Sequence, residues 1–328
     1  MEEIHSEQEQ VPKNFSKVQE SAERVRKEIH KVIVGQDEMI TLILAGLFTG
    51  GHVLIEGVPG IAKTMTVNLL AKALDLNFKR IQFTPDLMPA DVTGTSVYNV
   101  QSGSFEFKSG PIFSNIVLID EINRSPAKTQ AALFEVMEEL QVTVDGRSHP
   151  MSKPFMVLAT QNPIEQEGTY KLPEAQQDRF QFRIKIDYPS YAEELEIIKR
   201  FEGDFEQSTI RDVKPVLSFI ELESCMKTIQ SVYIKEELIE FIAKIIDKTR
   251  RTTDLFLGAS PRASLAIVKT SKALAAMQGR DYVSPDDIVQ ALYPVLNHRL
   301  ILSAEKEMDG FDVKEVLDEL IKQVDVPR

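Results

Sequence analysis

The chain has 328 residues and a formal net charge of −12, with 43% apolar and 27% charged residues. This composition is typical of a water-soluble protein with a sizeable core, and the acidic balance argues against a nucleic-acid partner. The single cysteine, Cys225, excludes an internal disulfide and a cysteine-rich metal site. No apolar run approaches the roughly 18–20 residues of a membrane-spanning helix, and residues 1–15 lack the basic start and apolar centre of a secretory signal. We therefore expect a cytoplasmic protein without membrane insertion.

In chain order, a polar stretch leads into a charged helical pattern over 16–30. Helical stretches then alternate with five β-rich runs, at 52–57, 78–83, 116–121, 155–162 and 179–186. The first four runs are mostly apolar, as expected for buried parallel strands covered by helices on both faces. The fifth alternates apolar and polar residues like an edge strand. The alternation of strands and helices predicts an α/β core with a parallel sheet.

Two hairpins interrupt this pattern, and a helical region follows it. Residues 96–107 place Tyr98 and Phe105 on alternating positions around a Ser-Gly turn, and 142–149 contains Asp145-Gly146, a strong two-residue turn signal. No strand is predicted after 190, and helices are expected at 191–202, 219–230, 235–250, 261–278, 285–297 and 313–324. We divide the chain into an extension at 1–24, an α/β core at 25–188, a connecting helix and linker at 189–213, and a helical domain at 214–328.

The stretch "EGVPGIAKT" follows an apolar run and opens a helical one, which is the setting of a phosphate-binding loop. Gly57 and Gly60 can adopt backbone angles that turn successive N–H groups toward phosphate oxygens. Lys63 is placed to reach the β- and γ-phosphates of ATP, and Thr64 to ligate Mg²⁺. The alternative, a helix start with an incidental lysine, is disfavoured because a cation there opposes the helix dipole unless an anion is bound. The expected nucleotide-binding segment comprises Gly57, Val58, Pro59, Gly60, Ile61, Ala62, Lys63, Thr64 and Met65.

Ala62 stands where the usual pattern of this loop has its last glycine. The chain enters a helix at this point, so we expect a negative φ at Ala62, which alanine adopts without strain. The methyl group should therefore not disqualify the loop.

The stretch "IVLIDEINR" carries an acidic pair 57 residues beyond Lys63 (120 − 63). At the end of a buried strand beside the loop, Asp120 would hold Mg²⁺ through water and Glu121 would orient the attacking water. The alternative is that the acidic pair caps the next helix, which the upstream phosphate loop makes less attractive.

Three more polar side chains stand at positions that suit phosphate chemistry. Asn162 ends another apolar run, where its amide could hydrogen-bond the γ-phosphate or the attacking water. Arg179 precedes the fifth run, and its guanidinium could stabilise transition-state charge at a neighbouring subunit's site, with a surface salt bridge as the alternative. In "GASPRASL", Ser260 is the expected N-cap, which puts Arg262 in a first helical turn that disfavours positive charge. We expect Arg262 to meet an anion from outside its helix, a phosphate in preference to a structural acid.

Together these stretches resemble the AAA+ ATPases, specifically the MoxR family, from "VIVGQDE" to "LNHRLIL". The resemblance implies an AAA+ parallel-sheet P-loop core flanked by helices and followed by a smaller all-helical lid domain. The two hairpins look like the helix-2 insert and the pre-sensor-1 hairpin of such proteins. By resemblance, Asp120 and Glu121 correspond to the Walker B pair and Asn162 to sensor 1. Arg179 corresponds to the arginine finger and Arg262 to sensor 2. The positions that contact adenine correspond to Val34, Gly35 and Gln36.

The resemblance further implies a homo-oligomeric ring, commonly hexameric, with a chaperone-like role on protein clients such as von Willebrand factor A domain proteins. The favoured hypothesis is a ring that hydrolyses ATP to remodel a client, with ATP between the core and helical domain and Arg179 of the next subunit closing the site. One alternative is a nucleic-acid-dependent motor, although the hairpins offer only Lys108, Arg147 and Lys153 to a nucleic acid. Another is an ATP-dependent binding switch with little turnover. The roles of Arg124 and Arg299, phosphate contact or structural salt bridge, stay open.

Overall fold

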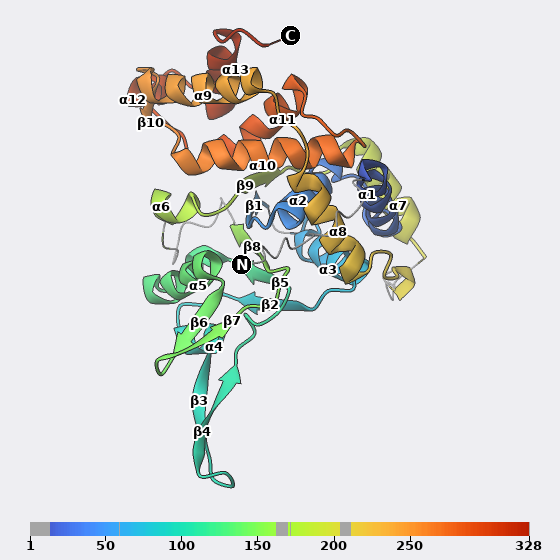
Figure 1. The fold of residues 1–328 in the computed structure, drawn as a ribbon, viewed down its shortest axis with the longest axis vertical. Coiled ribbons are helices and arrows are strands. Elements are labelled where there is room, and N and C mark those ends of the chain that lie inside the picture. Colours follow the sequence, from blue (N-terminus) through green and yellow to red (C-terminus); the bar gives the residue numbers. More distant parts are fainter. Residues whose placement is uncertain (1–13, 59, 162–169, 171, 204–210, 328) are drawn as a thin grey trace, which may run out of the picture.

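The computed structural model describes residues 14–58, 60–161, 170, 172–203 and 211–327. A sheet of five strands in the order β2-β5-β8-β1-β9 lies at its centre, and every neighbouring pair is parallel (Figure 1). The strands are β1 (Val53–Gly57), β2 (Phe78–Gln82), β5 (Ile116–Asp120), β8 (Met156–Gln161) and β9 (Phe182–Ile186). Each lies within one of the five predicted runs, so the parallel α/β core is confirmed, and β9 is the edge strand that its alternation predicted. The expectation of a buried strand at 78–83 is wrong, because β2 is the other edge strand and Ile81 is its one buried residue.

Alternate residues of the central strands enter two different apolar cores, because successive side chains of a strand point to opposite faces. Ile55 of β1 and Leu118 of β5 belong to the core formed with α1 (Phe15–Ile29), α2 (Asp37–Thr49) and α3 (Lys63–Ala73). Their neighbours Leu54 and Val117 belong to the second core, formed with α4 (Pro89–Thr93) and α5 (Ala127–Glu139). The sheet is therefore covered by helices on both faces, which explains why its central strands are apolar throughout.

The predicted C-terminal helices all form, with ends within two residues of the expected ones. They are α7 (Tyr191–Phe201), α8 (Phe219–Gln230), α9 (Glu236–Arg251), α10 (Pro261–Met277), α11 (Pro285–Leu296) and α13 (Val313–Lys322), with the shorter α6 (Glu174–Gln177) and α12 (Ala304–Met308) besides. Buried residues of α8, α10 and α11 join the core that covers β1. The helical region thus packs directly on its own α/β core.

Polar contacts add to this packing. Arg183 of β9 donates to the Asn297 side-chain oxygen at 3.0 Å, and Asn297 donates back to the Arg183 carbonyl at 2.9 Å. Gln181 donates to the Thr270 hydroxyl of α10 at 3.1 Å. Because Asn297 follows α11, these contacts hold both α10 and α11 against the edge of the sheet.

The expectation that no strand follows residue 190 is wrong. β10 (Leu255–Leu257) and β11 (Ile301–Leu302) pair antiparallel within the helical region. Strands of three and two residues are too short to show a period of two, which is why the sequence pattern missed them.

Both predicted hairpins are confirmed, as β3 (Gly94–Asn99) with β4 (Ser104–Ser109) and β6 (Gln141–Val144) with β7 (Arg147–Pro150). Asp145 and Gly146 both have positive φ, as a tight two-residue hairpin turn requires. Figure 1 shows the β3–β4 hairpin projecting away from the body, at the opposite end from α13. None of the described helices has the length and apolarity needed to span a bilayer.

Candidate nucleotide site

The predicted phosphate loop joins the end of β1 to the start of α3 at the carboxyl edge of the sheet. A Cβ at Gly57 would lie 2.7 Å from the Ile186 carbonyl oxygen, so only glycine fits where β9 passes this closely. Gly60 has φ +87°, a conformation that glycine adopts without strain. Both glycines therefore have a conformational reason for their places, while Pro59 lies outside the described residues.

Ala62 does not have the negative φ that we expected. It is the N-cap of α3 and lies in the left-handed region, with φ 58° and ψ 18°. The chain turns into the helix through this residue, so the glycine of the usual pattern serves a conformational purpose, and alanine there costs roughly 1–2 kcal/mol. Packing of the Ala62 methyl against the neighbouring core offsets part of this cost.

The Lys63 ammonium group contacts the loop and interacts electrostatically with the acidic pair. It donates to the Gly57 carbonyl at 2.5 Å. Burial lowers the pKa of Lys63, and attraction to Asp120 and Glu121 opposes that shift. Both carboxylates are therefore within electrostatic range of the loop lysine, the convergence that a shared Mg²⁺–ATP site requires.

Asp120 ends β5 as a buried carboxylate with two partners. One oxygen accepts from the Thr160 hydroxyl at 3.1 Å, and the other accepts from Arg80 Nε at 2.5 Å. A buried carboxylate must be paired, and an aspartate at this edge is a ligand of the kind Mg²⁺ prefers. The chemistry of Asp120 thus suits Mg²⁺, while the pairing of Asp120 with Thr64 as metal ligands stays a prediction.

Glu121 follows directly in the left-handed region, with φ 57°. Its carboxylate accepts from Gln82 Nε2 at 2.5 Å and pairs with Arg124 Nε at 3.2 Å. It makes no side-chain cap to the 3-10 helix that follows, Ile122–Arg124, so the capping alternative for this acid is wrong. Of the two roles left open for Arg124, the structure shows the salt bridge.

Sequence analysis missed Arg80 and Gln82, the two β2 side chains that contact the acidic pair. β2 pairs with β5 in a register that sets Gln82 opposite Asp120. The available signal was the two polar residues at alternate positions of the run 78–83, which place both on one face of the strand. Pairing with β5 specifically is a property of the sheet order, which the sequence did not reveal.

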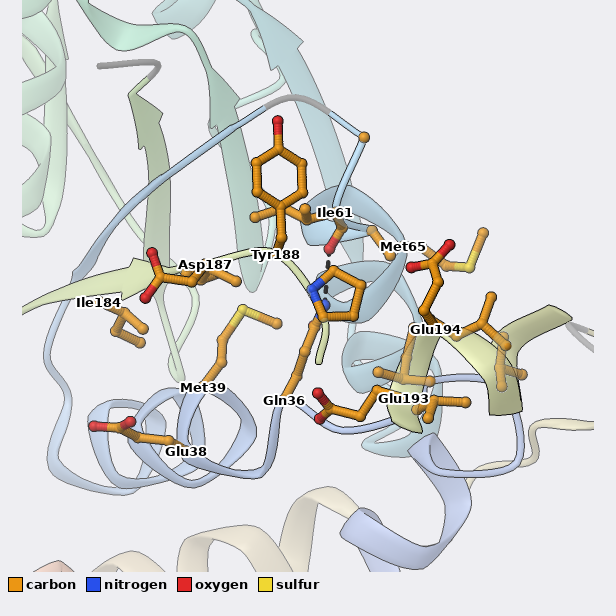
Figure 2. A pocket seen from close by; sticks show the side chains of 18 of the residues that line it. Gln36, Glu38, Met39, Ile61, Met65, Ile184, Asp187, Tyr188, Glu193 and Glu194 are labelled. Atoms are coloured by element: carbon orange, nitrogen blue, oxygen red, sulfur yellow. Dashed lines mark hydrogen bonds between the residues drawn. The ribbon is translucent and has the colours of Figure 1, made fainter. Parts of the chain in front are cut away.

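A cavity of about 770 Å³ opens beside the loop. Val34 and Gln36 line it, as do Gly60, Ile61, Ala62 and Met65 of the loop, so the predicted nucleoside and phosphate segments share one cavity. Gln36 donates to the Ile61 carbonyl at 2.8 Å and accepts from the Thr66 hydroxyl at 3.1 Å, and Figure 2 shows it reaching toward Ile61. Gln36 therefore braces the phosphate loop.

Gly35 has φ +67°, a conformation that favours glycine, and the carboxylate of Glu193 on α7 lies where a Cβ would stand. Many of the lining residues that the sequence hypothesis did not include come from the segment after β9 and from α7, among them Asp187, Tyr188, Pro189, Glu193, Glu194, Ile197 and Phe201. Figure 2 labels Asp187, Tyr188, Glu193 and Glu194 of this group.

Arg179 and Arg262 lie instead at the amino edge of the sheet, which is the side where the N-terminal ends of the parallel strands meet. They line a smaller cavity, of about 290 Å³, together with the residues that precede β1 and β9. A five-residue strand spans about 16 Å, so neither side chain can reach the loop of its own chain.

The sequence hypothesis that placed ATP between the core and the helical domain therefore needs correction. None of the described residues lining the larger cavity belongs to 214–328. Arg262 does meet an anion from outside its helix, but that anion is the carboxylate of Glu138 on α5, which also pairs with Arg179. A structural acid occupies the position where we expected phosphate. Asn162, the remaining predicted residue, lies outside the described residues.

Arg299 has a structural role. Its buried guanidinium pairs with Asp178 at 2.6 Å and donates to the Phe180 and Asp178 carbonyls at 2.6 and 2.9 Å. Ser260 at the start of α10 donates to the same Asp178 carboxylate. This cluster ties the helical region to the segment that carries Arg179.

Comparison with known proteins agrees with this arrangement. The family model described as "ATPase family associated with various cellular activities (AAA)" matches residues 52–182, and the "AAA lid domain" model matches 247–320. Chaperone MoxR1 of Mycobacterium tuberculosis is 42% identical over 93% of this chain and 82% of its own length, and protein MoxR of Methylorubrum extorquens is 29% identical over 93% and 94%. The crystal structure of a candidate ATPase from Cytophaga hutchinsonii superposes with a TM-score of 0.88 at 43% identity, covering 96% of this chain and 97% of that one. The chain belongs to the MoxR family of AAA+ ATPases.

Proposed function

We propose that the chain binds ATP with Mg²⁺ in the larger cavity and hydrolyses it to remodel a protein client. The observation that carries this proposal is the convergence of Lys63, Asp120 and Glu121 beside a cavity lined by Val34 and Gln36. The apolar walls suit the adenine base, and the start of α3 with its lysine suits the phosphates.

In this scheme Lys63 leaves the Gly57 carbonyl and binds the β- and γ-phosphates. Thr64 and Asp120 hold Mg²⁺, which when bound neutralises charge that develops on the phosphate oxygens. Glu121 exchanges its contacts with Gln82 and Arg124 for the attacking water, which it orients and deprotonates.

Arg179 and Arg262 complete the site from a neighbouring copy. At the amino edge, the two arginines cannot reach a nucleotide bound by their own chain. A head-to-tail contact would bring the amino edge of one copy to the carboxyl edge of the next. Such heterologous contacts close into a ring, which we take to be a hexamer from the family resemblance. Arg262 therefore acts in trans with Arg179, unlike in the sequence hypothesis.

The client is a protein, and the family resemblance favours one with a von Willebrand factor A domain. The relative from M. tuberculosis is named a chaperone. The projecting β3–β4 hairpin exposes apolar side chains, with Val100 85% and Phe105 69% exposed, which suits contact with another protein.

The test is phosphate release and fluorescent-ATP binding by the wild type, Lys63→Ala and Glu121→Gln, each measured with and without double-stranded DNA. We expect the wild type to hydrolyse ATP, Lys63→Ala to lose binding, and Glu121→Gln to bind without turnover. Equal, near-zero release by wild type and Glu121→Gln in assembled rings would instead favour a binding switch. Salt-sensitive stimulation by DNA would favour a nucleic-acid motor.

A further inference from the structure

Glu138, in the last turn of α5, contacts both arginines at the amino edge. One carboxylate oxygen pairs with Arg179 Nη1 and the other with Arg262 Nη2. The three residues come from the end of α5, the segment before β9 and the start of α10, so one side chain joins three distant parts of the sequence. Neither oxygen is shared between the two guanidinium groups.

Each arginine keeps most of its hydrogen-bonding capacity. Arg179 Nη1 also donates to the Phe134 carbonyl at 2.9 Å, and the guanidinium lies 6.0 Å from the centre of the Phe134 ring. Among the described residues, Arg179 Nε and Nη2 and Arg262 Nε and Nη1 have no hydrogen-bond partner. A guanidinium has five N–H donors arranged to grip an oxyanion. Each side chain is thus anchored by one nitrogen and presents the others.

The surrounding charge favours an added anion. Both arginines line the smaller cavity with Lys269, while Arg299 is already neutralised by Asp178. Glu138 offsets only one of the three remaining positive charges. A net positive cavity in a chain of net charge −12 is suited to a phosphate group.

Two guanidinium groups side by side repel each other and have high rotamer entropy unless something holds them. The Glu138 carboxylate reduces the repulsion between the two guanidinium groups by its charge. It also restricts their rotamers, since each of its two oxygens holds one nitrogen of one arginine. Arg262 depends on it most, because its side chain is 48% exposed and lies in a first helical turn that disfavours positive charge. The fold itself is anchored elsewhere, by Arg299 with Asp178.

We propose that Glu138 is a positioning residue that sets Arg179 and Arg262 side by side as one receptor for the terminal phosphate of the ATP held by the neighbouring copy. This inference rests on the proposed ATP hydrolysis in trans. It makes the two arginines one functional unit with a shared anchor.

The first test is independent of hydrolysis and uses the nucleotide-free full-length chain. Phenylglyoxal modifies guanidinium groups that are not engaged by carboxylates, and peptide mass spectrometry gives the rate at each arginine. Glu138→Ala should speed modification of both Arg179 and Arg262 about three- to fivefold, the range for a partly exposed ion pair. Glu139→Ala, which removes the adjacent exposed acid, is the matched control and should change neither rate. Unchanged rates at both arginines in Glu138→Ala would overturn the proposal.

The second test uses assembled protein. Glu138→Ala should lower kcat about tenfold with KM for ATP unchanged, because misplaced arginines weaken the transition state of the neighbour's site and not nucleotide binding. Glu138→Asp keeps the charge but shortens the reach, and should also lower kcat. Arg262→Ala should cost little more once Glu138 is Ala. Faster turnover of Glu138→Ala would show that Glu138 merely competes for the arginines and would overturn the proposal. If wild type does not hydrolyse ATP, the proposed function fails, while the modification rates still decide whether Glu138 holds both arginines.

Discussion

The two edges of the central sheet carry complementary groups. At the carboxyl edge lie a lysine, two carboxylates and a cavity of about 770 Å³. At the amino edge lie Arg179 and Arg262 around Glu138, with a smaller cavity. Strands of five residues keep the two sets about 16 Å apart. In the proposed mechanism, one chain therefore supplies both halves of a phosphoryl-transfer site, in positions where they cannot meet.

The two edges share one property, which is that the principal charged groups of each already contact other groups of the same chain. Lys63 contacts the Gly57 carbonyl, Asp120 contacts Arg80, and Glu121 contacts Gln82. At the other edge Glu138 pairs with both arginines. In the proposed function, binding of nucleotide would exchange these protein contacts for phosphate contacts, and the free energy of each exchange would be the difference between two paired states.

The largest expected effect tests whether the two edges work across a subunit boundary. Arg179→Ala alone should lower turnover by about 10³-fold, and Glu121→Gln by about 10²-fold or more. Mixing the two variants should restore activity, because an intact Glu121 in one copy then faces an intact Arg179 in the next. In a random 1:1 ring, roughly a quarter of the interfaces combine both intact residues. Steady-state phosphate release after subunit exchange measures the recovery.

The control for that experiment is a chain carrying both substitutions, mixed with Arg179→Ala. No interface in this mixture has an intact arginine, so activity should stay at the level of Arg179→Ala alone. Failure of the first mixture to recover, despite proven subunit exchange, would contradict completion of the site in trans.

The next prediction compares the loss of stability on replacing either of two arginines at the amino edge. Arg299 is buried and pairs with Asp178, so Arg299→Met should lower the free energy of unfolding by about 3 kcal/mol, the cost of leaving a partner charge unpaired. Arg262→Met is the matched control, and we expect a change of less than about 1 kcal/mol because its ion pair is partly exposed. Denaturant titration of the nucleotide-free chain measures both. Equal losses in the two variants would remove the distinction between a structural and a functional arginine.

The sequence predicted most of the fold because its strands and helices are long and strongly patterned. The five runs of the sheet and helices such as α10 show clear periods, and the Asp145-Gly146 turn has its own signature. The chemistry-bearing residues were found where a local rule pointed to them, as with Lys63 in a loop or Arg262 in a first helical turn. Residues whose role depends on the order of the strands, such as Arg80 and Gln82, were missed. Which edge a residue occupies was also missed for Arg262, because that depends on how α10 packs on α1 and α2.

A state-dependent effect tests the pairing of Asp120. Arg80, whose side chain is 54% exposed, is the cation beside that buried carboxylate. Arg80→Gln should lower the free energy of unfolding by about 1–2 kcal/mol in EDTA. The loss should shrink with saturating Mg²⁺ and ADP, where Asp120 exchanges Arg80 for the metal. Thermal unfolding under the two conditions measures the difference. Lys79→Gln, which removes a neighbouring exposed charge of the same strand, serves as the control. Equal losses under both conditions would show that the ion pair persists with nucleotide.

The smallest effect concerns the backbone of the phosphate loop. Ala62→Gly removes left-handed strain of roughly 1–2 kcal/mol but gives the unfolded chain about 0.5–1 kcal/mol of added conformational entropy. We expect a net gain of about 0.5–1 kcal/mol in the free energy of unfolding, measured by denaturant titration without nucleotide. Gly60→Ala is the matched opposite change, because a Cβ there meets no atom within 4 Å and only its φ of +87° opposes a side chain. That variant should lose stability for the reason that Ala62→Gly gains it. A loss in both would mean that Ala62 enters the helix with negative φ after all, and the packed methyl group would then be its only contribution to the loop.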